Sequence, residues 1–324
     1  MRIVFPEGAE FVENPADLDP LRRLGALVLC PGAPRDKADL IARCHDAEAV
    51  FLDYSLMDAE VLRALPAIRF ICFLGIGYRA HIDVDEATRR GVTVTYTPDY
   101  GATSVAEHAL GMILALTRHI AAGFVSMRAG RWEPGSFKGV ELRGKTLGIV
   151  GLGPIGSEMA RLGAGIGMKL IGWTRRASPE RARHGLVLVP IEEVFTGGDV
   201  VSVHLSHTPE TEALVSRALL SRMKPEAYFL NTARARVVDN AALADLLRAG
   251  KIAGAALDVH EEEPPRGAYV FRELPNVLIT PHIGYNTREA ASNMLRIAIA
   301  TLEAYRRGEA LHVVNPAARQ TVAG

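Results

Sequence analysis

Cysteine is scarce in this sequence, which holds Cys30, Cys44 and Cys72 among 324 residues. None shows CxxC spacing, and three thiols cannot all pair. We therefore expect small buried side chains in a reducing compartment rather than a disulfide framework. Net charge is also lacking, because 37 basic residues balance 37 acidic ones. The chain thus has no global field that would attract nucleic acid or an anionic membrane.

Long apolar runs are absent as well. No run approaches the roughly 18 residues that span a bilayer. No basic and apolar leader precedes residues 2–5, which already have the composition of a strand. We expect a cytoplasmic protein with neither a membrane nor a nucleic acid as partner. The length exceeds one ordinary core and predicts two domains.

Short apolar runs alternate with helical stretches from residue 1 to about residue 98. The predicted helices cover residues 36–45 and 58–65. This alternation predicts a parallel sheet with helices on both faces. A turn with two glycines, Gly75 and Gly77, follows one strand and could expose backbone N–H groups to an anion, although a plain turn fits equally well. The predicted strands are 3–5, 26–29, 49–52, 70–74 and 92–95.

A break at residues 97–101 indicates a linker, and a long helix over 103–120 follows, with Thr103 or Ser104 as its N-cap. Apolar positions cover more than half of its surface. That pattern favours burial between domains or across a subunit interface. The next segment, 121–143, is polar and glycine-rich and is interpreted as an arm.

The stretch from Leu147 to Gly156 organises the rest of the chain. A short apolar strand ends in Gly151-x-Gly153-x-x-Gly156, with Pro154 and Ile155 between the last two glycines, and helical spacing follows. The first glycine permits a sharp turn, the second lets backbone approach a pyrophosphate, and the third permits close helix–strand packing. A tight turn alone would explain the glycines, but the flanking strand and helix favour a dinucleotide site.

Alternation resumes after Gly156 and predicts a complete doubly wound dinucleotide domain. Helices are expected at 210–223, 240–249 and 287–307, and the tail 311–316 is expected to return to the first domain. The predicted strands are 169–173, 186–188, 199–204, 227–231, 255–259 and 277–280.

Three chemically suited residues follow predicted strands of this domain: Arg234, Glu263 and His282. Parallel topology gathers strand ends at one edge of the sheet. Arg234 can bind the carboxylate of a 2-keto acid with two parallel hydrogen bonds. His282 can donate a proton to the carbonyl oxygen, and Glu263 can orient its ring and raise its pKa. Singly, each could be a surface arginine, a loop acid or a structural histidine, but their joint placement favours chemistry.

Along nearly its whole length the chain resembles the D-isomer-specific 2-hydroxyacid dehydrogenase family. That resemblance implies a Rossmann dinucleotide-binding domain over 101–285 and a smaller flavodoxin-like substrate domain over 1–100, completed by 286–324, with hinges near Tyr100 and Tyr285. It also implies a homodimer built on the 103–120 helix. The motifs that carry the resemblance are 151–156, 223–225 with 231–234, 254–259, 263–264 and 281–284.

The resemblance further assigns site residues. Arg234, Glu263 and His282 are catalytic, the backbone at Ile76 and Gly77 binds the substrate carboxylate together with Arg234, and no metal is expected. Thr232 belongs to the cofactor site, and Asp258 accepts a hydrogen bond from the nicotinamide carboxamide. The chain departs from the family pattern at Ala235 and Arg236, where glycine usually follows the arginine, and at Arg79 and His81, which either shape the pocket or face solvent.

The end of the second strand of this domain, Thr174-Arg175-Arg176, bears on the cofactor. An NAD site needs an acid here for the ribose hydroxyls, whereas two guanidinium groups suit a 2′-phosphate. We therefore expect preference for NADP(H), with NAD(H) possible. The predicted reaction is reduction of a small 2-keto acid such as glyoxylate or hydroxypyruvate. Alternatives are an NAD(H)-preferring enzyme of another 2-hydroxy acid and a dinucleotide-sensing, corepressor-like protein. Formate oxidation fits poorly, because its enzymes place an amide at the position of Glu263.

Overall fold

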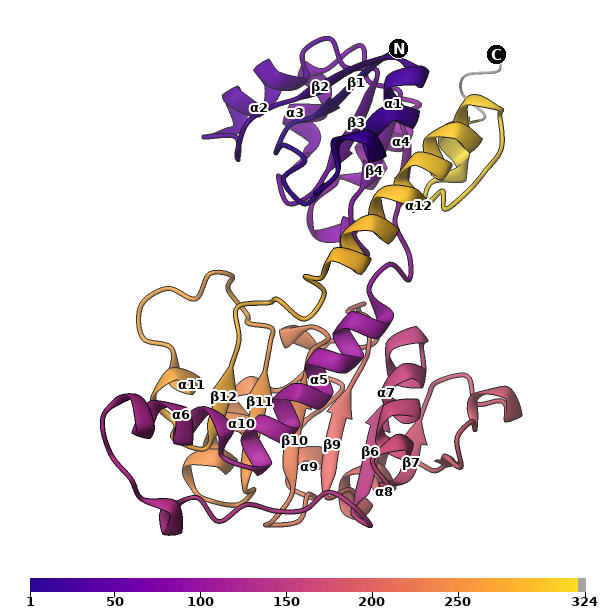
Figure 1. The fold of residues 1–324 in the computed structure, drawn as a ribbon. Helices are drawn as coiled ribbons and strands as arrows, with labels where there is room; N and C mark the ends of the chain where they lie inside the picture. Colours follow the sequence, from indigo (N-terminus) through magenta and orange to yellow (C-terminus); the bar gives the residue numbers. More distant parts are fainter. Residues whose placement is uncertain (320–324) are drawn as a thin grey trace. The chain divides into compact units, whose positions relative to one another are not determined.

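The computed structural model describes residues 1–319 and divides the chain into two compact units (Figure 1). Unit 1 comprises Met1–Gly101 together with the segment that begins at Thr287, and unit 2 comprises Ala102–Asn286. The last residues of the expected substrate domain, 320–324, lie outside the described residues. Each unit has its own parallel sheet and hydrophobic core.

The sheet of unit 1 confirms the flavodoxin-like prediction. Its five strands are all parallel in the order β2-β1-β3-β4-β5, which is one of the two common doubly wound orders. All residues of β3 and β4 are buried, as expected for central strands covered on both faces. The strands are β1 (Arg2–Phe5), β2 (Ala26–Leu29), β3 (Ala49–Leu52), β4 (Phe70–Phe73) and β5 (Thr93–Tyr96).

Helices cover both faces of this sheet. On one face lie α2 (Lys37–Cys44), α3 (Ala59–Ala64) and α4 (Val84–Arg89). The aspartate before each of them caps the helix by accepting from a backbone N–H. On the other face lie α1 (Asp19–Leu24) and the long α12 (Arg288–Arg306). The tail does return to unit 1, because Val313 bridges Thr95 and the Asn315 side chain bonds the amide of Val94.

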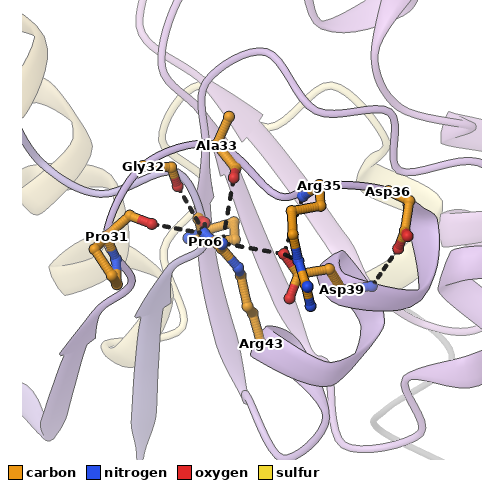
Figure 2. Close-up of polar contacts among 8 residues, drawn as sticks. All are labelled: Pro6, Pro31, Gly32, Ala33, Arg35, Asp36, Asp39 and Arg43. Carbon is orange, nitrogen blue, oxygen red and sulfur yellow. Dashed lines mark hydrogen bonds and ion pairs between the residues drawn. The ribbon is translucent and has the colours of Figure 1, made fainter.

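Arg43 of α2 ties together the loops that leave β1 and β2 (Figure 2). Its Nη1 donates to the carbonyl oxygens of Pro6 and Gly32, both at 2.6 Å. Its Nη2 donates to Ala33 O at 3.2 Å and to Asp39 Oδ2 at 3.1 Å. The side chain is only 16% exposed, so the charge is neutralised by carbonyl dipoles and one carboxylate.

The sheet of unit 2 has seven parallel strands in the order β12-β11-β10-β9-β6-β7-β8. The six strands from β8 to β11, in the order β8-β7-β6-β9-β10-β11, have the Rossmann order, and β12 is one strand added at the edge. This order confirms the predicted dinucleotide-binding architecture. The strands are β6 (Thr146–Val150), β7 (Lys169–Trp173), β8 (Val187–Leu188), β9 (Val200–Val203), β10 (Tyr228–Asn231), β11 (Gly254–Leu257) and β12 (Val277–Ile279).

The helices of unit 2 also divide between the two faces. One face packs against α5 (Ala102–Thr117) and α7 (Pro154–Gly165). The other packs against α8 (Ile191–Gly197), α9 (Arg217–Leu220), α10 (Asn240–Arg248) and α11 (Val270–Glu273). Short 3-10 helices lie in connections of both units: η1 (Pro15–Leu18), η2 (Tyr78–Ala80), η3 (Pro134–Ser136), η4 (Pro179–Arg181), η5 (Ala235–Val237) and η6 (Pro316–Arg319).

Two predicted helices are wrong in extent. The 103–120 helix begins at Ala102, so Thr103 and Ser104 lie within it and do not cap it. It ends at Thr117, and a second helix, α6 (Ile120–Arg128), follows His119, whose φ of +54° interrupts the helix. The predicted 210–223 helix is reduced to the four residues of α9, because the chain turns at Ala213, where φ is +48°.

No single helix among residues 1–319 is long and apolar enough to cross a membrane, and the bent pair α5–α6 meets the criterion by length and composition only when its two helices are joined.

Candidate active site

The glycine-rich turn after β6 has the geometry that its sequence predicted. Gly151 has φ +100°, and a Cβ there would lie 2.5 Å from His204 O. A Cβ on Gly156 would lie 1.9 Å from Gly151 O. Both values are far below any real contact, so the first glycine permits the turn and the third lets α7 pack against it.

The N-terminus of α7 can receive an anion. Gly153 is the N-cap, no side chain caps the helix, and Pro154 occupies its first position. A Cβ on Gly153 would meet nothing within 4 Å, so space is open beside the first turn. Backbone N–H groups and the helix dipole both favour a phosphate at such a place. The residues present therefore fit the pyrophosphate of a dinucleotide.

Positive charge gathers at the neighbouring strand end. Thr174, Arg175 and Arg176 follow β7, and both arginines are exposed. This end lies beside the glycine turn, because Gly151 N donates to Trp173 O at 2.8 Å. Arg181, which sequence reasoning missed, donates from Nη1 to Leu152 O inside the glycine turn.

The turn after β10 carries Arg234. The side chain of Asn231 shapes this turn, because its Oδ1 accepts from Ala233 N at 2.9 Å and its Nδ2 donates to Arg234 O at 3.0 Å. Arg234 is half-buried, and its Nη1 donates to Ala233 O at 2.6 Å. The hydroxyl of Thr232 is buried and has no partner among residues 1–319, so it can donate to a ligand at this strand end.

Glu263 and His282 are hydrogen-bonded to each other, in the pairing that the sequence predicted. The Oε2 of Glu263 lies 2.6 Å from Nδ1 of His282, and its Oε1 accepts from His260 N at 2.9 Å. Burial works against the charged carboxylate, but the bonds from His282 and His260 outweigh it and hold the pKa of Glu263 below its ordinary value. With Nδ1 on Glu263, the Nε2 of His282 is the atom left to exchange a proton.

Asp258 lies at the end of β11, between the strand ends of Arg234 and His282. It is 1% exposed. Its Oδ1 accepts from Thr280 Oγ1 at 2.6 Å and from Ile283 N at 3.0 Å, and its Oδ2 accepts from Gly284 N at 2.8 Å. Burial raises the pKa of Asp258, but the neighbouring His108 and these three bonds outweigh it and hold the pKa below its ordinary value, so the group is a carboxylate.

His260 provides a further link between the loop after β11 and the loop after β12. Nε2 of His260 lies 2.9 Å from Thr280 O, and its Nδ1 lies 2.5 Å from the hydroxyl of Tyr269. A carbonyl only accepts, so His260 carries a proton on Nε2, and a neutral ring accepts from Tyr269. Burial raises the pKa of Tyr269 to about 12, so its hydroxyl keeps its proton. Sequence reasoning missed His260, His108 and Thr280, because no motif marks a partner across the sheet edge.

The predicted residues are therefore brought together in part. Glu263 and His282 are bonded, and Asp258 bonds the loop that carries His282. Arg234 lies on the neighbouring strand end, with Asp258 N donating to Asn231 O at 3.0 Å. Ile76 and Gly77 belong to unit 1, in the loop after β4. Among residues 1–319, no group accepts from the amide of either residue, so both can bind an anion.

Taken together, unit 2 presents a phosphate turn, a carboxylate-bound histidine and an arginine at one sheet edge. The profile described as "D-isomer specific 2-hydroxyacid dehydrogenase, NAD binding domain" matches residues 110–284. The chain belongs to the D-isomer-specific 2-hydroxyacid dehydrogenase family. It is therefore an oxidoreductase whose cofactor is a nicotinamide dinucleotide.

Relatives of this dehydrogenase carry several names. A glyoxylate reductase of Pyrococcus furiosus is 40% identical over 285 residues, 85% of this chain and 84% of that protein. A hydroxypyruvate reductase of Blautia hydrogenotrophica is 32% identical over 97% of this chain and 100% of that protein. D-3-phosphoglycerate dehydrogenases also match, for example that of Mycobacterium leprae at 40% identity, but the alignment spans only 48% of that longer protein.

Solved structures agree with the fold. The TT0316 protein from Thermus thermophilus superposes with a TM-score of 0.87 at 33% identity, over 97% of this dehydrogenase and 100% of that chain.

Proposed function

We propose that this dehydrogenase reduces a small 2-keto acid, glyoxylate or hydroxypyruvate, with NADPH as the hydride donor. The observation that carries the proposal is the contact between Glu263 and His282, in which Oε2 lies 2.6 Å from Nδ1. His282 follows β12, which pairs with β11, the strand that ends just before Asp258. The similarity to a glyoxylate reductase over 85% of the chain supports the substrate class.

In the proposed reaction a carbonyl group becomes a secondary or primary alcohol. When bound, the reduced dinucleotide supplies the hydride for the carbonyl carbon. Nε2 of His282 gives its proton to the carbonyl oxygen, and Glu263 stabilises the imidazolium before that transfer. Arg234 binds the substrate carboxylate with a planar pair of N–H donors. Backbone amides of Ile76 and Gly77 are proposed as further donors to that carboxylate.

Loss of His282 tests this assignment. In His282→Ala we expect kcat for glyoxylate to fall by about 10²- to 10⁴-fold, the usual contribution of a general acid. The dinucleotide Kd should stay unchanged, because the phosphate turn is intact. The measurements are NADPH oxidation with glyoxylate and hydroxypyruvate, and dinucleotide titration followed by fluorescence. His45→Ala, at an exposed position of unit 1, is the control. Near-normal turnover in His282→Ala would show that another group is the acid.

The preference for NADP(H) rests on Arg175 and Arg176, with no carboxylate in the segment 173–176. We propose that both guanidinium groups bind the 2′-phosphate, and that Thr174 and Thr232 line the cofactor site. Asp258 is proposed to accept a hydrogen bond from the carboxamide at Oδ2, to which a single amide, that of Gly284, donates among residues 1–319.

Removal of these arginines tests the cofactor preference. Arg175→Ala and Arg176→Ala should each raise the KM for NADPH by about tenfold, because each loses an exposed charge-assisted bond. The KM for NADH should change little. Arg222→Ala, an exposed arginine of the same unit, is the control. Equal kcat/KM for NADPH and NADH in the unaltered enzyme, or preference for NADH, would overturn the preference.

We further propose that the enzyme is a homodimer. The apolar residues of α5 pack mostly within the core of unit 2. The exposed apolar side chains gather on α6 and just beyond it, which moves the proposed interface from the 103–120 helix toward α6.

A further inference from the structure

His108 of α5 reaches the base of the loop that carries His282. Its Nε2 lies 3.1 Å from Thr280 Oγ1 and 3.4 Å from Asp258 Oδ1. The imidazole is 22% exposed, whereas the carboxylate of Asp258 is 2% exposed. Helix α5 thus contributes a polar side chain to a group of residues 150 to 172 positions further along the chain.

The direction of each hydrogen bond in this group follows from the acceptors. Asp258 is a carboxylate and can only accept, so the single proton of Thr280 Oγ1 points to Asp258 Oδ1 at 2.6 Å. The Thr280 oxygen must then accept from His108, which requires a proton on Nε2. The bonds therefore run from His108 through Thr280 to Asp258.

Asp258 in turn holds the backbone on the C-terminal side of His282. It accepts from the amides of Ile283 and Gly284 at 3.0 and 2.8 Å. His282 itself has φ +53°, an uncommon backbone conformation for a residue with a side chain. Packing is tight as well, because a Cβ on Gly284 would lie 2.9 Å from Asp258 Oδ2 and 3.3 Å from His108 Cδ2. Loss of His108 would remove the donor to Thr280 Oγ1 and weaken the bond from Thr280 to the buried carboxylate of Asp258, and would thereby loosen this loop.

We propose that His108 is a positioning residue for the proton transfer by His282, and that it acts through Thr280 and Asp258. The step rests on the proposed function, because it assigns the acid–base role to His282. His108 does not touch the substrate in this scheme. Its contribution is to keep Asp258 bonded, and thereby to hold the turn 282–284 in one conformation.

Substitutions at His108 separate this role from simple packing. His108→Leu fills similar space without an N–H donor, and we expect kcat to fall about tenfold or more, as for a misplaced catalytic group, with an unchanged KM for glyoxylate. His108→Gln retains an N–H donor near the Nε2 position and should recover most of the lost kcat. Gly111→Ala is the control on the same helix, because a Cβ there meets nothing within 4 Å.

A double-mutant cycle tests whether the effect passes through Thr280. Thr280→Val should lower kcat to a similar extent. The kcat of the double variant His108→Leu/Thr280→Val should be no lower than the kcat of the more impaired single variant. Multiplicative effects, or a wild-type kcat in His108→Leu, would overturn the proposal.

Hydrogen–deuterium exchange supplies a readout that needs no turnover. The amides of Ile283 and Gly284 should exchange faster in His108→Leu than in the unaltered protein, and at the unaltered rate in Gly111→Ala and His108→Gln. Unchanged exchange in His108→Leu would contradict the proposal even if kcat fell. If the unaltered enzyme reduced no 2-keto acid, the proposed function would fail, while the exchange measurement would still test the link from His108 to the loop.

Discussion

At the scale of single residues, the charge on a carboxylate follows from the donors around it. Glu7 in unit 1 is buried, and the successive amides of Asp53, Tyr54 and Ser55 all donate to it. Within residues 1–319 no group donates to the carboxyl group of Asp53 beside it, and burial together with the negative charge of Glu7 raises its pKa to about 6. In unit 2, Glu263 has two donors and a lowered pKa. The pKa is thus lowered at Glu263, where donors surround the carboxylate, and raised at Asp53, where burial and a neighbouring negative charge act.

Glu263→Gln tests the ion pair in catalysis. A neutral amide can accept from Nδ1 of His282 but cannot stabilise an imidazolium. We expect kcat for glyoxylate to fall by about 10²- to 10⁴-fold with a nearly unchanged dinucleotide Kd. Steady-state kinetics and fluorescence titration are the measurements. Glu261→Gln, in the same acidic run and exposed, should leave both parameters unaltered.

The same substitution has a pH signature in stability. Because the folded pKa of Glu263 lies below its unfolded value, its ionised form stabilises the fold above the unfolded pKa. That contribution disappears as the pH falls through the lower, folded pKa. The difference in unfolding free energy between the unaltered protein and Glu263→Gln should therefore be present at pH 7 and shrink in acid. Urea unfolding at several pH values measures it, and a difference that grows toward acid would contradict the assignment.

The residues proposed for the chemistry could largely be predicted from the sequence, but the residues that hold them in place could not. Glu263 and His282 could be placed together because parallel strands end at one edge. His108 and His260 could not, since their bonds to Thr280 depend on how α5 and two loops pack. Arg181 was equally hidden, because nothing in its local sequence indicates that it donates to Leu152 O.

At the scale of elements, Arg43 shows how one side chain fixes several loops. It bonds the carbonyl oxygens of two strand-end loops and the carboxylate of Asp39 (Figure 2). Arg43→Ala should lower the unfolding free energy by about 2–3 kcal/mol, because buried acceptors lose a charged donor. Arg43→Lys should recover part of this loss, since an ammonium reaches fewer of these oxygens. Urea unfolding measures both, with Arg23→Ala, exposed on α1, as control. An unfolding free energy within about 0.5 kcal/mol of the unaltered value would contradict this role.

The strands were easier to predict than the helices. Buried parallel strands are short apolar runs, and every predicted strand overlaps one in the structure. Helix α6 was missed because its apolar residues face solvent instead of a core. The usual alternation of an apolar and a polar helix face is therefore absent from its sequence. The 210–223 helix failed for another reason: the Thr211 hydroxyl bonds Ser206 O and the Thr208 amide, which favours a turn.

At the scale of the whole molecule, the strand order of unit 2 decides where the two ends of the cofactor would bind. The ends of β12, β11 and β10 carry His282, Asp258 and Arg234, whereas the end of β7 carries Arg175 and Arg176. Five strand spacings separate β12 from β7, or about 24 Å at the usual interstrand distance. The glycine turn after β6 lies between these ends, as a pyrophosphate linking two nucleosides requires.

The surface of unit 2 bears on assembly, because exposed apolar side chains gather on α6 and just beyond it. A patch of this kind on a globular unit favours burial against a partner, and a second copy would cover both patches at once.

Phe124→Asp, at a side chain 65% exposed, should convert the proposed dimer of about 70 kDa, twice the 35.0 kDa chain, into a monomer. Light scattering after size-exclusion chromatography measures this. Val187→Asp, 58% exposed on the far strand β8, should leave the mass unaltered. A monomeric unaltered protein would refute the dimer, and a Phe124→Asp dimer would place the interface elsewhere. The exposed apolar residues on α6 and just beyond it are Ile120, Phe124, Val125, Met127 and Trp132.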